Sequence, residues 1–200
     1  GWWTFDNAPT TSVADSSGNG YDGVASSANI FKTDTPFGTG KSIDLNGNQY
    51  VAVSDGGQQT VFNGANAFSI SAWVKEWPDG GWEPYVSKRG ESGQGWQIRR
   101  RSGDQDRMSF TLRGVGNDDW YIQRNINDNQ WHHIVGTFGQ GYRRGYVDGT
   151  MTGEEQRFGS VNMTGSQLVF GARDNSGNYN NGLNIGNHAN VWLDDVRYYN

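Results

Sequence analysis

Apolar and polar residues alternate along several short stretches of this chain, and no stretch of ten or more residues keeps an apolar face at helical spacing. The clearest alternation runs from Phe68 to Lys75, where every second side chain is apolar. Successive side chains of a β-strand point to opposite faces, so this period of two predicts strands with one buried face. The pattern recurs at Ile43 and Leu45, Val51 and Val53, Met108 to Leu112, Ile134 to Phe138, Leu168 to Gly171, and Trp192 to Tyr198.

Residues suited to tight turns separate these stretches, and the chain has 30 Gly but only 4 Pro. Asp148-Gly149, directly after Tyr146-Val147, predicts a two-residue hairpin, because a type I′ turn requires positive φ at both central residues. Short strands joined by such turns are typical of a sandwich. We therefore predict an all-β fold, a two-sheet antiparallel jelly roll, formed by a single domain over residues 1–200.

The composition narrows the possible partners. The chain has no Cys, which excludes a disulfide framework and Cys-ligated zinc. No apolar run approaches the roughly 18–20 residues of a membrane span. A net charge of −5 argues against a nucleic-acid binder driven by bulk electrostatics. The basic residues are mostly Arg, whose planar guanidinium group suits bidentate contact with carboxylate or sulfate.

Five sequence blocks follow one another in a characteristic order. They are Trp3 to Asp6 with the turn Asp15 to Gly23, Phe68 to Lys75, Trp131 to Phe138, Tyr146 to Gly149, and Val191 to Asn200. In this order and spacing, from about Trp3 to Tyr199, the chain resembles the laminin-G-like jelly rolls of the concanavalin A-like lectin and glucanase superfamily. The resemblance implies the fold more than the function, because this fold carries lectins, carbohydrate-binding modules, adhesion domains and glycan-cleaving enzymes.

The sequence offers no recognised catalytic arrangement. Glycan hydrolysis usually needs two carboxylates about 5–9 Å apart, and laminarinase-type relatives of the fold carry them as Glu-x-Asp-x-x-Glu, a spacing that no Glu of this chain has. Jelly-roll lyases carry a Gln-Ile-His strand where this chain has Gln97-Ile98-Arg99. His132 and His133 fall in a block shared by the family, which favours a structural role. We expect a protein without enzymatic activity.

The resemblance implies one structural calcium ion. Domains of this type often tie the N-terminal segment to the last strand with calcium, and the matching ligand positions are Asp6, the turn at Asn46-Gly47, and Asp194. Oxygen-rich Asp and Asn side chains suit this hard cation. We expect Asp194 to share a strand face with Val196. The alternative is that Asp194 accepts hydrogen bonds from loop amides and that Asp6 only ends a strand.

Aromatic residues on predicted loops are candidates for stacking against a sugar ring. Trp77 and Trp82 lie in a segment with Pro and Gly, and Trp120 follows a polar turn at a loop-to-strand junction. Trp73, Trp131 and Trp192 belong to strand blocks and are expected to support the fold. The alternative for the loop residues is that they cover the edge of the sandwich.

Arginine residues gather near the same segments. By alternation Gln97, Arg99 and Arg101 share the face opposite Trp96 and Ile98. Arg113 opposes the row of Met108, Phe110 and Leu112, and Arg124 follows shortly after. The four Arg residues are candidates for recognising an anionic glycan. The alternative is a solvated face paired with Asp104, Asp106, Asp118 and Asp119. Arg143 and Arg144 stand where relatives carry alternating apolar residues, which leaves the inner face of that strand undetermined.

These features lead to three functional hypotheses. The first is a non-catalytic, lectin-like carbohydrate-binding module of a larger secreted protein, monomeric and directed at a polysaccharide that is anionic. The second is a calcium-dependent, protein-binding adhesion domain, and the third is a glycan lyase or hydrolase with an unrecognised site. Each implies an extracellular or cell-surface location, with neither nucleic acid nor a membrane span involved.

Overall fold

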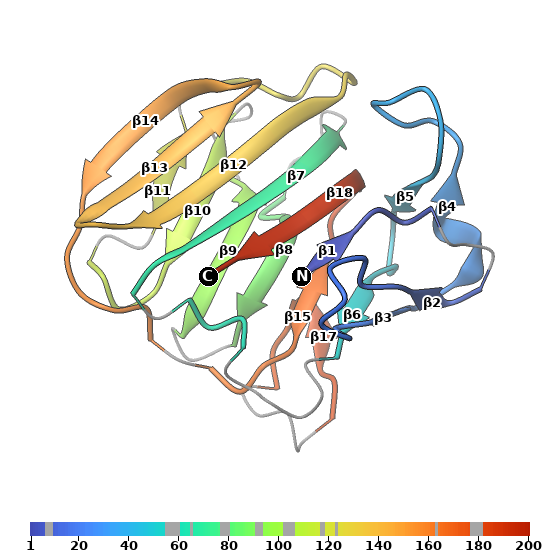
Figure 1. Ribbon diagram of the computed structural model, residues 1–200, viewed down its shortest axis with the longest axis horizontal. Helices are drawn as coiled ribbons and strands as arrows, with labels where there is room; N and C mark the ends of the chain where they lie inside the picture. The colour runs from blue at the N-terminus through green and yellow to red at the C-terminus, as the bar shows by residue number, and fades with distance from the viewer. Residues whose placement is uncertain are drawn as a thin grey trace.

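The computed structural model describes residues 1–6, 10–54, 61–64, 66–76, 81–90, 94–101, 107–116, 119–122, 124–162, 164–176 and 182–200. Within these ranges the chain forms β-strands, one short 3-10 helix, η1 (Ala28–Ile30), and no α-helix. Two large antiparallel sheets lie face to face (Figure 1). The predicted two-sheet antiparallel sandwich is confirmed.

Sheet A is the sheet at the front of Figure 1. Its strand order is β14-β13-β12-β7-β18-β5-β4. The short strand β1 also pairs with β18 but is not part of this linear order. The strands span β1 (Trp2–Trp3), β4 (Phe31–Lys32), β5 (Ser42–Leu45), β7 (Phe68–Glu76), β12 (His132–Gly139), β13 (Tyr142–Val147), β14 (Thr150–Gln156) and β18 (Val191–Tyr199).

Sheet B lies behind sheet A, with the order β11-β10-β9-β8-β15-β6-β3-β2. Its strands span β2 (Ser12–Val13), β3 (Gly23–Ala25), β6 (Val51–Val53), β8 (Pro84–Arg89), β9 (Gly95–Arg100), β10 (Met108–Leu112), β11 (Asp119–Ile122) and β15 (Leu168–Phe170). A separate two-stranded sheet pairs β16 (Arg173–Asp174) with β17 (Ile185–Gly186).

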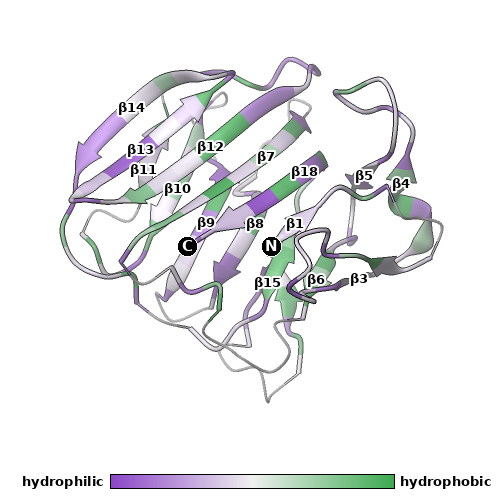
Figure 2. Ribbon diagram, in the orientation of Figure 1, coloured by the Kyte–Doolittle hydropathy of each residue, from purple (hydrophilic) through white to green (hydrophobic). Residues whose placement is uncertain are grey.

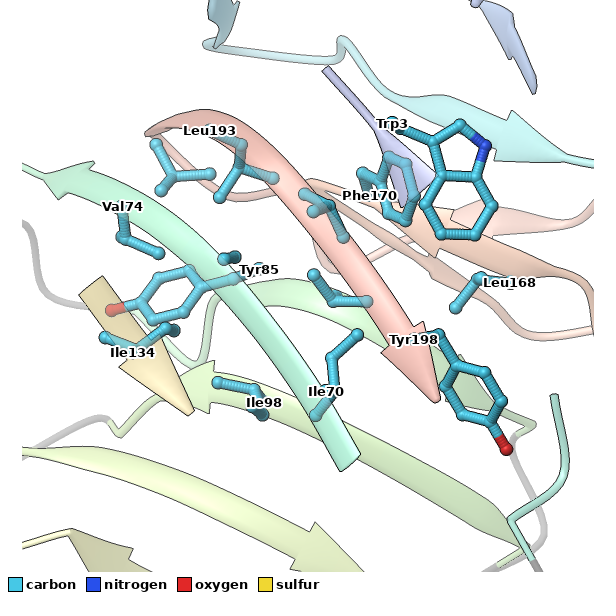
Figure 3. Packing of buried hydrophobic residues seen from close by; sticks show 14 of the residues in the cluster. Trp3, Ile70, Val74, Tyr85, Ile98, Ile134, Leu168, Phe170, Leu193 and Tyr198 are labelled. Atoms are coloured by element: carbon cyan, nitrogen blue, oxygen red, sulfur yellow. The ribbon is translucent and has the colours of Figure 1, made fainter. Parts of the chain in front are cut away.

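The core lies between the two sheets and is rich in aromatic rings (Figure 3). The ring of Tyr198 from sheet A stacks on Trp96 from sheet B, with centroids 5.8 Å apart, and Trp3 meets Phe170 edge to face at 5.1 Å. Each such ring buries a large apolar area and therefore fills more of the space between the sheets than an aliphatic side chain would. Along the strands of sheet A, hydrophobic residues alternate with hydrophilic ones (Figure 2).

The hairpin between β13 and β14 has the predicted turn. Asp148 and Gly149 adopt φ of 50° and 74°, so both central residues have the positive φ of a type I′ turn. Asp148 also accepts hydrogen bonds from the backbone amide of His133 and from the ring of His132, the latter at 2.9 Å. His132 is held on its other side by Asp128 at 3.1 Å, which supports a structural role for this histidine.

The structure determines the inner face of β13. Arg143 points inward and is fully buried (0% exposed), whereas Arg144 points outward. The Arg143 guanidinium group donates to the carbonyl of Phe110 in sheet B at 3.0 Å and pairs with Glu155 on β14. One buried arginine therefore links the two sheets from the inner face that the sequence left undetermined.

The first and last strands of the chain pair with each other in sheet A. The N-terminal amino group of Gly1 donates to the carbonyl of Tyr198 at 3.1 Å, and the amide of Tyr198 donates back to Gly1 at 2.9 Å. The two ends of the chain consequently lie next to each other (Figure 1).

Candidate functional site

The outer face of sheet B carries polar side chains in cross-strand register. Ser87 on β8 pairs with Gln97 on β9, which pairs with Thr111 on β10. In the next row Arg99 pairs with Ser109, which pairs with Tyr121 on β11. Trp96 and Ile98 point into the core, so the predicted division of β9 into two faces is correct. We call Ser87, Arg89, Gln97, Arg99, Arg101, Ser109, Thr111 and Tyr121 the arginine face.

The arginine face is largely enclosed although it lies outside the hydrophobic core. Gln97 is 1% exposed and Arg99 is 7% exposed. With its amide oxygen turned toward the guanidinium groups, Gln97 accepts hydrogen bonds from Arg89 at 2.9 Å and from Arg99 at 3.0 Å. The hydroxyl group of Ser87 is buried and has no hydrogen-bond partner among the described residues. Buried polar atoms in folded proteins are normally hydrogen-bonded, so the Ser87 hydroxyl group is an exception on this face.

Two guanidinium groups stack on aromatic rings at the edge of this face. Arg99 lies 4.1 Å from the ring centroid of Trp82, and Arg101 lies 3.8 Å from that of Tyr121. Such stacking is electrostatically favourable and keeps the N–H groups of arginine at the ring edge, where they can donate. Trp82 is 38% exposed, and Arg101 and Tyr121 are half-buried. These three residues form the accessible edge of the arginine face.

The remaining predicted ligand-binding residues lie in different places. The backbone of Arg113 donates to Gly95 at 3.0 Å, which puts Arg113 beside the end of β9 that pairs with Arg89. Arg124 pairs with Asp148 at 3.1 Å, at the hairpin turn of sheet A. Trp77 lies outside the described residues, as do Asp104, Asp106 and Asp118, and only the backbone of Asp119 is described.

Trp120 lies on strand β11 and not on a loop. It pairs with Phe110, a core residue, and packs against the core. A side chain at Gly153 would collide with the Trp120 ring, because an ideal Cβ there falls 2.8 Å from it, and a Cβ at Gly145 would lie 3.3 Å from the same ring. The ring therefore covers the edge of the sandwich, which was the alternative given for these aromatic residues. Trp120 faces the core side of sheet B, whereas Trp82 stacks on Arg99 at the outer face.

A second candidate site contains the predicted metal ligands Asp6 and Asp194. Both line a cavity of about 300 Å³ between β1, the segment Phe37 to Gly40, and the middle of β18. Asp195 and Arg197 also line it and pair with each other at 3.0 Å. Each of the two candidate ligands accepts one backbone amide at 2.7 Å, Asp6 from Lys41 and Asp194 from Asp195.

A bulge in β18 decides how Asp194 is oriented. The register shifts between Asp194 and Arg197, and Asp195 adopts a φ of 46°. Asp194 pairs with Trp73 on the outer side of sheet A, whereas Val196 lies in the core. The prediction that Asp194 and Val196 share a face is wrong, because the bulge adds one residue and breaks the alternation.

The Asp194 carboxyl group has an unusual environment for an acid. Its side chain is 2% exposed. Burial, with added repulsion from Asp6 and Asp195, raises its pKa from 3.8 to about 7. Within the parts of the chain that the structure describes, no three His, Cys, Asp or Glu side chains are grouped so that they could hold a metal ion by themselves. A cation here would need backbone oxygens or water in addition to the two carboxylates.

Asn46 and Gly47 lie elsewhere. Asn46 lines a separate cavity of about 250 Å³ together with Asp44, Asn190 and Trp192. The amide of Gly47 donates to the side chain of Asn190 at 3.1 Å. The structure thus brings Asp6 and Asp194 to one cavity and the Asn46-Gly47 turn to another.

The sequence analysis missed several residues of the arginine face. Ser87 and Arg89 join it through strand pairing, and Tyr121 joins it as the ring beneath Arg101. Alternation along 84–89 could have indicated Ser87 and Arg89. A bulge between Pro84 and Val86 hides this signal, because it shifts the phase of the alternation at the start of the strand.

Comparisons with known proteins agree with this architecture. The family model of the concanavalin A-like lectin/glucanases superfamily matches residues 45–200. This chain belongs to that superfamily. No curated protein sequence matches it significantly.

Solved structures of botulinum neurotoxin binding domains share the fold. One accompanies the finding that cell entry of botulinum neurotoxin type C depends upon interaction with two ganglioside molecules (15% identity, TM-score 0.65, covering 98% of this chain and 47% of that one). Two others are the binding domain of neurotoxin DC in complex with SialylT (16%, 0.66, 98% and 46%) and with rat synaptotagmin II (15%, 0.65, 98% and 47%). This chain spans about half the length of these structures, and at such identities the likeness shows the fold alone.

Among the described residues, no helix is long and apolar enough to cross a bilayer.

Proposed function

We propose that this chain is a non-catalytic, lectin-like carbohydrate-binding module of a larger secreted protein, and that it binds an anionic polysaccharide at the arginine face. The observation that carries the proposal is the stacking of Arg99 on Trp82 and of Arg101 on Tyr121 at the accessible edge of this face. Guanidinium groups bind carboxylate or sulfate, and an exposed indole presents an apolar face to a sugar ring.

The comparisons support a binding role of this kind. The superfamily includes lectins, and the similar structures are binding domains whose described partners include gangliosides and a protein. The sequence lacks the paired carboxylates of the glucanases, which supports a module without catalysis.

Binding should depend on salt and on the accessible edge of the arginine face. Arg101→Ala should weaken binding of a sulfated or uronate-rich polysaccharide mainly at low salt, since exposed charges are screened over about 8–10 Å at ordinary ionic strength. Trp82→Ala should cost roughly 1–3 kcal/mol at every salt concentration, by analogy with the stacking of bases on aromatic side chains. Isothermal titration calorimetry across a salt series measures both effects.

Arg124→Ala is the matched control, because Arg124 pairs with Asp148 on the other sheet and should leave the affinity unchanged. If the affinity for the best-binding polysaccharide does not change with salt concentration, the ligand is not anionic. Sustained release of product from any polysaccharide by the pure protein would contradict the absence of catalysis.

We further propose that Asp6 and Asp194 hold a structural calcium ion. The support is their shared cavity and the raised pKa of Asp194, since a buried carboxylate is stabilised by a nearby cation. Calcium would supply positive charge that joins the N-terminal segment to β18. The Asn46-Gly47 turn, at its separate cavity, is not part of this proposal.

Chelation should lower the melting temperature, and added calcium should restore it. A ligand that binds only the folded state stabilises by mass action, about 2.7 kcal/mol at a hundredfold excess over its dissociation constant. Differential scanning fluorimetry with chelator, calcium and magnesium measures the shift. An unchanged melting temperature after chelation of protein shown to contain the metal would refute a structural ion.

A further inference from the structure

A small cavity on the outer face of sheet A combines one indole ring with three oxygen-bearing side chains. It has a volume of about 250 Å³ and lies where β5 meets the start of β18. Its lining consists of Trp192, Asp44, Asn46 and Asn190. Pockets that enclose drug-sized ligands measure about 300–1,000 Å³, so this one suits a smaller ligand, such as a single ring.

Trp192 lies outside the hydrophobic core. Its neighbours Val191 and Leu193 are fully buried between the sheets, whereas Trp192 is half-buried on the opposite side of the strand. It pairs with Asp44 on β5 and with Lys75 on β7, both of which also point outward. Trp3 and Trp96 fill the core. The indole of Trp192 therefore forms part of the cavity wall and does not serve the packing between sheets.

Charges around the cavity are balanced locally. Asp44 pairs with Lys32 at 3.6 Å, and Lys75, whose ammonium group lies 5.2 Å from the Trp192 ring centroid, pairs with Asp34 at 2.6 Å. These two ion pairs carry no net charge between them, so together they exert little net attraction on an ion. This separates it from the arginine face and from the Asp6–Asp194 cavity, and it favours an uncharged ligand.

The polar wall is held in place by its own hydrogen bonds. The amide of Gly47 donates to the Asn190 side chain at 3.1 Å. With its amide group turned toward them, Gln49 donates to the carbonyls of Asp44 at 3.1 Å and Asn46 at 3.3 Å. The turn that carries Asn46 is thereby fixed against β18. A preformed site loses less conformational entropy when its ligand binds.

We infer that this cavity binds one ring of a neutral saccharide. An uncharged sugar ring has an apolar C–H face that fits an indole, and hydroxyl groups that both donate and accept hydrogen bonds. The carboxylate of Asp44 accepts such bonds, and the amides of Asn46 and Asn190 can do both. The site lies on the sheet opposite the arginine face, so it stands independently of the anionic ligand proposed above.

The test uses nuclear magnetic resonance of the indole N–H groups, with the Trp192 signal assigned from Trp192→Phe. A panel of neutral oligosaccharides built from glucose, galactose, mannose, xylose and N-acetylglucosamine units should contain at least one that shifts this signal saturably and equally at low and high salt. Trp192→Ala should then weaken binding of that sugar by at least about tenfold, since loss of a stacking ring costs roughly 1–3 kcal/mol in comparable cases. Asp44→Asn, which keeps the shape of the side chain, should weaken it less.

Trp131→Phe is the control, because Trp131 also lies on the outer side of sheet A but donates to Asp34 and does not line this cavity. If Trp192→Ala does not fold, Trp192→Phe and Asp44→Asn provide the comparison. A panel without any sugar that shifts the Trp192 signal overturns the inference, as does unchanged affinity in both Trp192 and Asp44 variants. Arg101→Ala should leave the Trp192 response intact, so failure at the arginine face and failure here are separate results.

Discussion

Replacing Arg143 by Ala should lower the free energy of unfolding by about 3–5 kcal/mol, the range for truncation of large buried side chains. Arg143 is fully buried, donates to Phe110 across the sandwich and pairs with Glu155. Its removal leaves a cavity and takes a hydrogen bond from a buried carbonyl, and an unpaired buried polar group is costly. Urea denaturation followed by tryptophan fluorescence measures the change.

Arg144→Ala provides the matched comparison on the same strand. Arg144 pairs with Glu154 at 2.6 Å, but both side chains are partly exposed, so the loss should stay below about 1 kcal/mol. Arg143→Met should recover only the part of the loss that comes from the cavity, because it refills space but leaves the Phe110 carbonyl without its donor. Equal effects of Arg143→Ala and Arg144→Ala would contradict the role given to Arg143 between the sheets.

In the presence of chelator, the stability contributed by Asp194 should fall as the pH rises from about 4 to about 7. The pKa of Asp194 is raised from 3.8 to about 7 in the folded protein, so over this range the folded state keeps a proton that the unfolded chain has released. The contribution is fully present below about pH 4 and disappears as the pH rises through the folded pKa. One proton of difference corresponds to a slope of about 1.4 kcal/mol per pH unit.

Asp194→Asn isolates this effect, because Asn does not titrate. Chemical denaturation at several pH values should show wild-type protein losing stability relative to Asp194→Asn between about pH 4 and 7. Asp195→Asn should retain most of the slope, since burial is the main cause of the raised pKa of Asp194 and repulsion from Asp195 only adds to it. Calcium should abolish the slope if it binds the ionised carboxylate. Parallel pH profiles for wild type and Asp194→Asn would show that the carboxyl group is ionised throughout the range.

The sequence was sufficient to predict the architecture and one face of the site. Alternation correctly divided Phe68, Ile70, Ala72 and Val74 from their outward neighbours, and it separated Arg99 from Trp96 and Ile98. The Asp148-Gly149 dipeptide predicted the turn, because both residues tolerate the positive φ of a type I′ turn. These features are local, because each depends on the strand period or on the φ preference of one residue.

Features that depend on contacts between strands could not be predicted. The bulge that turns Asp194 away from Val196 leaves no clear mark in the sequence, because Asp195 adopts positive φ without being Gly. The inward position of Arg143 could not be predicted either, because it depends on the carbonyl of Phe110 in the other sheet, to which Arg143 donates a hydrogen bond. Trp120 follows a polar turn, and only its contact with Gly145 and Gly153 shows that it packs inward.

The pairing of β1 with β18 has a mechanical consequence. The strands are antiparallel and Gly1 bonds to Tyr198, so tension applied between residues 1 and 200 would pull the two strands apart from their shared end. In this geometry the hydrogen bonds break one after another, as in a zipper, and do not share the load as they would in shear. This seam should open at a lower force than the rest of the sandwich, and its opening would carry Trp3 out of the core before the long central strands of either sheet are disturbed.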